Sequence, residues 1–84
     1  MYNVIFDEEA IKFLEKLPKQ QRERVTNKIF DAKPDPLRFF ERLKGRHEYK
    51  LRVGDYRVIA DIQNNELIIL VLYIGHRRNI YKRI

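Results

Sequence analysis

The sequence contains no cysteine and only three glycines and three prolines. Without cysteine, the chain can form neither a disulfide nor a thiolate metal site, and it fits a reducing compartment. The low glycine and proline content argues against a disordered chain. The longest apolar run, residues 67–74, is too short to cross a bilayer, and residues 1–6 lack the pattern of an export signal. We therefore expect a cytoplasmic protein with no contact to membranes.

The chain is short, and acidic residues are scarce in its second half. With 84 residues, 44% of them hydrophobic, it has room for one modest core, and we expect residues 1–84 to form a single domain. Residues 43–84 contain nine Lys and Arg against four Asp and Glu, whereas residues 1–42 contain nine against eight. A basic surface of this kind suits a phosphate-rich nucleic acid, and it suits an acidic protein partner as well.

The first part of the sequence has patterns typical of a strand followed by helices. Residues 2–6 are β-prone and lead into Asp7, which can cap a helix whose first turn contains two acids. Apolar residues recur at helical spacing in 10–17 and again in 25–32, on either side of Pro18. Neither helix is long enough to be stable alone, so both need a surface to cover. These patterns predict a helical hairpin after a first strand.

From residue 47 onward the apolar pattern has a period of two. The β-prone runs 47–53 and 56–62 flank Gly54-Asp55, and Asn64-Asn65 precedes a third run, 66–74. These signals predict a three-stranded antiparallel meander. With the first strand added, we predict a small α+β domain of order β-α-α-β-β-β, in which an antiparallel sheet carries the helical hairpin packed on one face.

Two-residue loops at both turns would fix the pairing of the strands. Val53 would then face Tyr56, and Arg52 would face Arg57. One face of the sheet would be nearly apolar and would form the core with Tyr49, Leu51, Val53, Tyr56, Val58, Ala60, Ile62, Leu67, Ile69, Val71 and Tyr73. The opposite, outer face would carry Lys50 (facing Ile59), Arg52 and Arg57 beside Ile59, Ile68, Leu70, Leu72 and Ile74.

This outer face raises two questions. Directly opposed like charges destabilise a strand pair by up to about 1 kcal/mol, so Arg52 and Arg57 either hold an anion between them or fan apart into solvent. An open sheet normally has a polar outer face, so the apolar residues there need a cover. The tail after Gly75, the connection 34–46 or a bound partner can provide it.

The C-terminal tail adds cations and a phenol. Residues 76–83, HRRNIYKR, directly follow the third run, which brings Arg77 and Tyr81 near the basic hairpin. The sequence offers no acidic cluster for Mg²⁺ and only two histidines, so we expect neither a metal nor a cofactor. Grouped cations suit metal-free cleavage of RNA, in which the ribose 2′-OH attacks its own 3′-phosphate and expels the 5′-oxygen.

Three stretches together resemble the RelE branch of the RelE/ParE toxin superfamily. They are Leu43-Lys44-Gly45, then Tyr49 to Val58, then Ile74 to Tyr81. The helical hairpin followed by a meander also matches that fold. The resemblance implies a toxin of a type II toxin–antitoxin system that enters the ribosomal A site and cuts mRNA there. It further implies a cognate RelB-like antitoxin that wraps around the toxin in a hetero-oligomer.

The resemblance also implies residue roles. Arg57 and Arg77 would stabilise transition-state charge, Lys50 and Arg52 would position phosphate or transfer a proton, and Tyr81 would act as a base or stack on a nucleobase. The residues expected to bind RNA around this catalytic set are Lys44, Arg46, His76, Arg78, Lys82 and Arg83. RelE relatives often carry a further lysine where this sequence has Glu48, which leaves the proton-transfer scheme open.

Other interpretations remain open from the sequence. A ParE-like toxin shares the fold but inhibits gyrase and needs no RNA chemistry. A non-catalytic module that binds RNA or a partner would need only the basic face. His47 and His76 resemble the acid–base pairs of some related toxins, but a histidine beside basic residues is commonly an ordinary surface residue.

Overall fold

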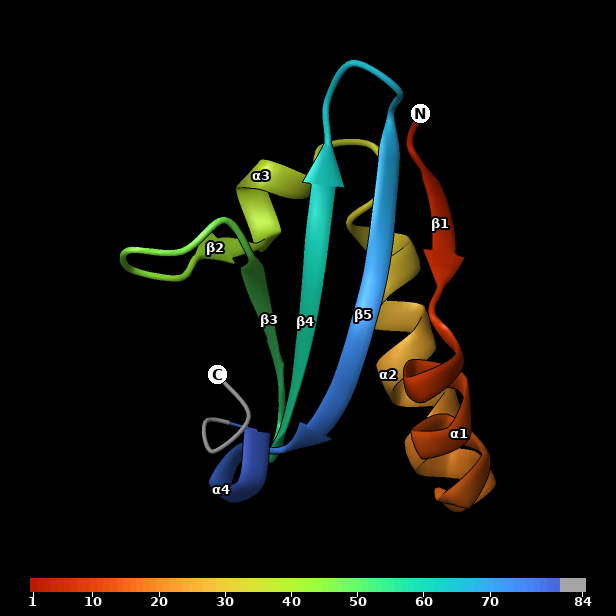
Figure 1. Cartoon of the computed structure of the whole chain (residues 1–84). Helices are drawn as coiled ribbons and strands as arrows, with labels where there is room; N and C mark the ends of the chain where they lie inside the picture. The colour runs from red at the N-terminus through yellow and green to blue at the C-terminus, as the bar shows by residue number, and fades with distance from the viewer. Residues whose placement is uncertain (81–84) are drawn as a thin grey trace.

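A five-stranded sheet carries the two long helices on one of its faces (Figure 1). The computed structural model describes residues 1–80. The elements along the chain are β1 (Asn3–Phe6), α1 (Glu8–Lys16), α2 (Lys19–Asp31), α3 (Pro36–Phe39), β2 (Glu41–Arg42), β3 (Tyr49–Val53), β4 (Tyr56–Gln63), β5 (Ile68–His76) and α4 (Arg77–Ile80). The predicted α+β architecture is confirmed, and the short elements β2, α3 and α4 add to it.

The strand order is β1-β5-β4-β3-β2. The pairs β3–β4 and β4–β5 are antiparallel, as predicted. The additional strand β2 also pairs antiparallel with β3. β1 instead runs parallel to β5, because the chain crosses the whole helical face between its first strand and the meander. The sheet is therefore mostly, and not entirely, antiparallel.

The two long helices form where the sequence predicts them. The side chain of Asp7 caps α1 by accepting a hydrogen bond from the Glu9 amide at 3.2 Å, and Pro18 separates α1 from α2. The buried residues of the two helices are Ala10, Leu14, Val25 and Ile29. Across residues 1–80, every helix falls short of the length and apolar composition that crossing a bilayer requires.

Side chains from the helices and the sheet form one main core. Its buried members are Ala10, Leu14, Val25, Ile29, Ala32, Phe40, Leu51, Val53, Val58, Ala60, Ile62, Ile69, Val71 and Ile74. Tyr49 and Tyr56 are partly buried against it. Every strand residue predicted for the core face therefore lies in this core or packs on it, except Leu67 and Tyr73.

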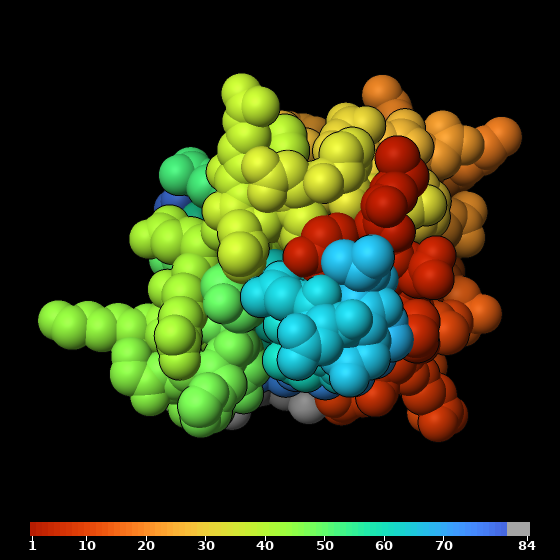
Figure 2. Space-filling model, turned by 90° about the horizontal axis from the view of Figure 1, so that it is seen from above, coloured from red at the N-terminus to blue at the C-terminus, as the bar shows by residue number. Residues whose placement is uncertain are grey.

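Leu67 departs from the prediction because the β4–β5 turn has four residues instead of two. Gln63 pairs with Ile68, which leaves residues 64–67 in the turn. Leu67 has a φ of 55° and is 44% exposed there. Figure 2 shows this turn beside the N-terminal segment, where the Tyr2 hydroxyl donates a hydrogen bond to the Asn64 side-chain oxygen at 2.7 Å.

Tyr73 departs from the prediction because β5 contains a β-bulge. The register on the two sides of the bulge is Ala60 with Val71 and Ile59 with Tyr73. Leu72 is therefore an extra residue on β5, and the faces of the strand are exchanged beyond it. As a result, Ile74 lies in the main core and Tyr73 lies on the outer face, the reverse of the prediction.

A second, smaller cluster covers part of the outer face. Leu43, Ile59 and Ile80 are buried in it, and Tyr73 packs against them. Leu43 comes from the connection 34–46 and Ile80 from the tail, so both internal covers considered from the sequence contribute. This cluster does not extend to strand β1 at the edge of the sheet, where Ile5 is 47% exposed.

We predict that Ile29→Ala lowers the free energy of unfolding by about 2–5 kcal/mol, because it opens a cavity in the main core. Ile29 is fully buried on α2. Ile11→Ala is the matched control, because Ile11 also lies on a helix but is 44% exposed, and its effect should stay within about 0.5 kcal/mol. Urea unfolding of both variants checks this, and equal losses would contradict the assignment of the core.

Candidate functional site

The β3–β4 hairpin has the predicted register. Gly54 and Asp55 form a two-residue turn, and Gly54 has a φ of 58°, which suits a glycine at the first position of such a turn. Arg52 lies opposite Arg57, and Lys50 lies opposite Ile59. Arg52 is exposed. The hairpin thus places two arginine residues opposite each other on the face away from the long helices.

The Arg57 side chain is held by the turn that precedes it. Only 8% of the residue is exposed, and its Nη1 donates hydrogen bonds to the carbonyl oxygens of Gly54 at 3.1 Å and Tyr56 at 3.0 Å. These bonds to neutral acceptors fix the guanidinium without cancelling its charge. Arg57 therefore provides a full, pre-oriented positive charge on the strand position opposite Arg52.

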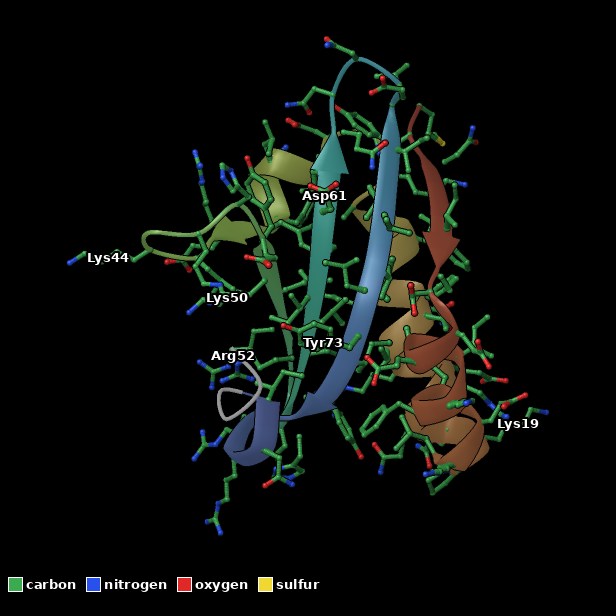
Figure 3. The ribbon with its side chains drawn as sticks, in the orientation of Figure 1. Lys19, Lys44, Lys50, Arg52, Asp61 and Tyr73 are labelled. Atoms are coloured by element: carbon green, nitrogen blue, oxygen red, sulfur yellow. The ribbon has the colours of Figure 1, made fainter. Side chains whose placement is uncertain are left out.

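Lys50 belongs to the same face, one step farther from the turn. It is half-buried, and Glu41 on β2 is its neighbour in the sheet register. Figure 3 shows Lys50 and Arg52 along β3, with Lys44 farther out on the loop between β2 and β3. The face therefore carries a line of cations that leads from the hairpin turn toward this loop.

The tail joins the hairpin through a backbone contact. The Arg77 amide donates a hydrogen bond to the Asp55 carbonyl oxygen at 2.7 Å, which fixes the start of α4 at the β3–β4 turn. Arg77 and Arg78 are exposed on α4, and Ile80 at its end is buried. The structure thus brings Arg77 to the hairpin that carries Arg52 and Arg57, as the sequence predicts.

His76 lies apart from these cations. It pairs with Tyr56 in the sheet, and its ring meets the Tyr56 ring edge to face, with 6.0 Å between centroids. Tyr56 in turn contacts Phe13 of α1 in the same manner, also at 6.0 Å. His76 is therefore part of an aromatic row on the helix face of the sheet, whereas the arginine pair is on the outer face.

The loop between β2 and β3 is basic and ordered by its own hydrogen bonds. Arg42 Nε donates to the Arg46 carbonyl oxygen at 3.0 Å, and Arg46 Nε donates to Glu48 Oε1 at 3.1 Å in an ion pair. Residues 42–47 line a hollow of about 510 Å³. Lys44 is exposed at the tip, whereas the charge of Arg46 is paired with Glu48.

Three side chains near the site were not expected from the sequence. Arg24 of α2 places its guanidinium 3.0–3.2 Å from where a side chain on Gly54 would begin, so it lies against the hairpin turn. Arg42 orders the basic loop, and Glu41 neighbours Lys50. The helical pattern identifies Arg24 as solvent-facing but contains no signal for its distance to a turn thirty residues later in the chain.

Several predicted residues lie outside the part of the chain that the structure describes. These are Tyr81, expected in catalysis, and Lys82 and Arg83, expected to bind RNA. Within residues 1–80, no group of three or more His, Asp or Glu side chains is arranged to hold a metal ion. The described site offers guanidinium and ammonium groups, which are suited to bind phosphate and to stabilise charge that develops on it.

Comparison with known proteins identifies the family. A family model described as the ParE toxin of type II toxin–antitoxin systems, parDE, matches residues 4–81. The chain belongs to this toxin family. The match spans both long helices, strands β2 to β5 and α4, so it includes each element that contributes to the site.

The similar proteins within the family are RelE toxins. The mRNA interferase toxin RelE of Escherichia coli K12 is 28% identical over 79 residues, which cover 90% of this chain and 83% of that protein. The toxin–antitoxin complex RelBE2 from Mycobacterium tuberculosis matches with a TM-score of 0.80 and 29% identity, covering 90% of this chain and 98% of the other. The archaeal RelE–RelB complex from Pyrococcus horikoshii matches with a TM-score of 0.77 and 28% identity, covering 90% of this chain and 94% of the other. The resemblance to the RelE branch is confirmed.

Glu48 is the position at which this toxin departs from the lysine expected in RelE relatives. The hydrogen bond and charge of Arg46 lower the pKa of the Glu48 carboxyl, and Glu48 raises the pKa of Arg46. Both groups are therefore charged at neutral pH and bound to each other. Glu48 orders the basic loop in place of adding a further cation to the site.

We predict that Arg46→Gln returns the pKa of Glu48 toward its ordinary value, because it removes the hydrogen bond and the charge that lower it. A lowered pKa means that the ion pair stabilises the loop at neutral pH and that this stabilisation is lost as the pH falls below about 4. An NMR titration of the Glu48 carboxyl in both proteins measures the difference. Lys44→Gln is the control, and an equal shift in that variant would contradict the specific pair.

Proposed function

We propose that this toxin is a ribosome-dependent endoribonuclease that cleaves mRNA without a metal ion and so inhibits translation. The observation that carries the proposal is the opposed pair of Arg52 and Arg57 at the hairpin turn, with Arg77 held at the same turn by its backbone. The name of the Escherichia coli relative, mRNA interferase toxin RelE, supports the same activity. Translating ribosomes would place the reaction in the cytoplasm.

The proposed reaction is an internal transesterification of the message. The ribose 2′-oxygen loses its proton and attacks the adjacent phosphorus, the bond from phosphorus to the 5′-oxygen breaks, and that oxygen receives a proton. The products are a 2′,3′-cyclic phosphate and a 5′-hydroxyl end. Negative charge accumulates on the phosphorane oxygens, where preorganised donors have most effect. DNA has no 2′-OH and would not react.

The geometry supports different roles for the cations. Arg57 is fixed by two carbonyl oxygens, so its charge can stabilise the transition state with little reorganisation, and Arg77 would act with it. Arg52 is exposed and Lys50 half-buried on the same face, where they would position the phosphate or transfer a proton. We assign to Tyr81 the base or stacking role that the family resemblance implies.

The remaining basic residues would contact the RNA backbone to different extents. Lys44 and Arg78 are exposed and free to approach phosphates, and we include Lys82 and Arg83 from the sequence alone. Arg46 would act mainly by ordering the loop through Glu48. His76 faces the helix side, so we expect it to support the sheet more than the RNA.

We further propose that the toxin is bound by a RelB-like antitoxin in a hetero-oligomer. The relatives from Mycobacterium tuberculosis, Pyrococcus horikoshii and Escherichia coli were solved as toxin–antitoxin complexes. This chain has a net charge of +6, which suits an acidic partner. An acidic antitoxin would compete with RNA for the same cations.

We predict that Arg57→Ala lowers the rate of mRNA cleavage on programmed ribosomes by about 100-fold or more, because a preorganised donor is lost. Arg57→Lys should recover only part of the activity, because an ammonium group lacks the planar guanidinium, in which Nη1 binds both carbonyl oxygens and the other nitrogens can bind phosphate. Arg38→Ala is the matched control, because Arg38 is an exposed arginine on α3 distant from the hairpin in sequence. Equal cleavage by all four proteins would contradict the proposed site.

The same proteins test the two other functions. Toe-printing with ribosomes separates cleavage from binding, because a non-catalytic module would stall on the message and leave it intact. A gyrase supercoiling assay tests the ParE-like activity. Inhibited supercoiling with uncut mRNA would replace the proposed function with gyrase inhibition, and we expect the opposite result.

A further inference from the structure

Helix α4 is held to the sheet at both of its ends. At its start, the Arg77 amide donates to the Asp55 carbonyl oxygen at 2.7 Å. At its end, Ile80 is 1% exposed and packs with Leu43 and Ile59. A helix of four residues has no stability of its own. Its position therefore depends on these two contacts.

Ile80 can pack in this position, which we call its seat, because residue 75 is a glycine. A Cβ on Gly75 would lie 2.8 Å from Cδ1 of Ile80, 3.5 Å from its Cβ and 3.7 Å from its Cγ1. Gly54 and Gly45 have positive φ angles, but Gly75 does not. The backbone at Gly75 thus does not itself require a glycine, and the absence of a side chain makes room for Ile80.

This seat adjoins the arginine pair. Gly75 is the register partner of Arg57, and Arg57 is the partner of Arg52, so the three residues form one row across β5, β4 and β3. Ile59 packs with Ile80 in the same buried cluster. It is also the register partner of Lys50. Ile80 therefore packs on a residue that is the direct strand neighbour of Lys50, next to the row that contains Arg57 and Arg52.

We propose that Ile80 and Gly75 are positioning residues: their contact fixes α4 across the outer face so that Arg77 is held beside the Arg52–Arg57 pair. Neither residue touches RNA in this proposal, which rests on the proposed function for its effect on cleavage. Displacing a catalytic group by about 1 Å can cost about 100-fold in rate. A methyl group at position 75 would press on the Cδ1 atom at the end of the Ile80 side chain. Because that side chain is only 1% exposed, it has little room to turn aside, and we expect the strain to pass to the helix that carries Arg77.

A double-mutant cycle tests the contact directly. Gly75→Ala adds a Cβ against Cδ1 of Ile80, and Ile80→Val removes that Cδ1 atom. We expect Gly75→Ala to lower the cleavage rate at saturating ribosomes by about 10-fold to 100-fold with little change in the concentration that gives half the maximal rate. Combined with Ile80→Val, the same change should cost much less, because the two substitutions compensate and so are not additive.

Amide hydrogen exchange provides a readout that does not depend on cleavage. The Arg77 amide, bonded to Asp55, should exchange faster in Gly75→Ala and in Ile80→Ala, and should recover protection in the double variant. Ile5→Ala is the matched control, because Ile5 is an isoleucine on the same face that is 47% exposed, and it should change neither exchange nor cleavage. Thermal unfolding of each variant checks that the folded fraction is equal.

The outcomes separate the two proposals. If wild-type toxin leaves mRNA intact on the ribosome, the proposed function fails, and the exchange of Arg77 alone decides whether Ile80 positions α4. Unchanged Arg77 exchange in Gly75→Ala, or losses that simply add in the double variant, would overturn the positioning role. Faster Arg77 exchange with wild-type cleavage would show that α4 is held by Ile80 but that its position does not matter for the reaction, which also overturns it.

Discussion

The arrangement of the site depends on the two-residue turn of Gly54 and Asp55. Its length sets Arg52 opposite Arg57, and its backbone carbonyls hold the neighbouring groups, since Gly54 accepts from Arg57 and Asp55 accepts from the Arg77 amide. The missing side chain of Gly54 also gives Arg24 its place against the turn. One turn therefore collects cations from a helix, two strands and the tail, although these lie far apart in the sequence.

Such a collection of like charges opposes folding, and the rest of the molecule offsets the cost. The opposition of Arg52 and Arg57 costs at most about 1 kcal/mol. A single buried isoleucine or leucine of the main core contributes about 2–5 kcal/mol by the effect of its removal, and that core lies on the other face of the sheet. The chain thus places its main core and its candidate site on opposite faces of the same sheet.

The sequence predicts the hairpin well because the turn has a distinct chemical signal. Gly54-Asp55 lies between two alternating runs, and alternation fixes the faces once the turn length is known. The β4–β5 hairpin was predicted less well because residues 67–74 are apolar throughout, so nothing marks which side chains face the core. Neither the four-residue turn nor the bulge at Leu72 leaves a pattern in such a run. Tyr73 and Ile74 were exchanged for this reason.

The basic loop shows that a count of charged residues does not reveal which charges are paired with each other. The second half of the chain carries nine Lys and Arg, but Arg46 is bound to Glu48 at 3.1 Å. A close ion pair has no net charge, so its field on an approaching phosphate decays faster than that of a free cation. The glutamate that replaces an expected lysine therefore costs the site one positive charge without adding an unpaired negative one.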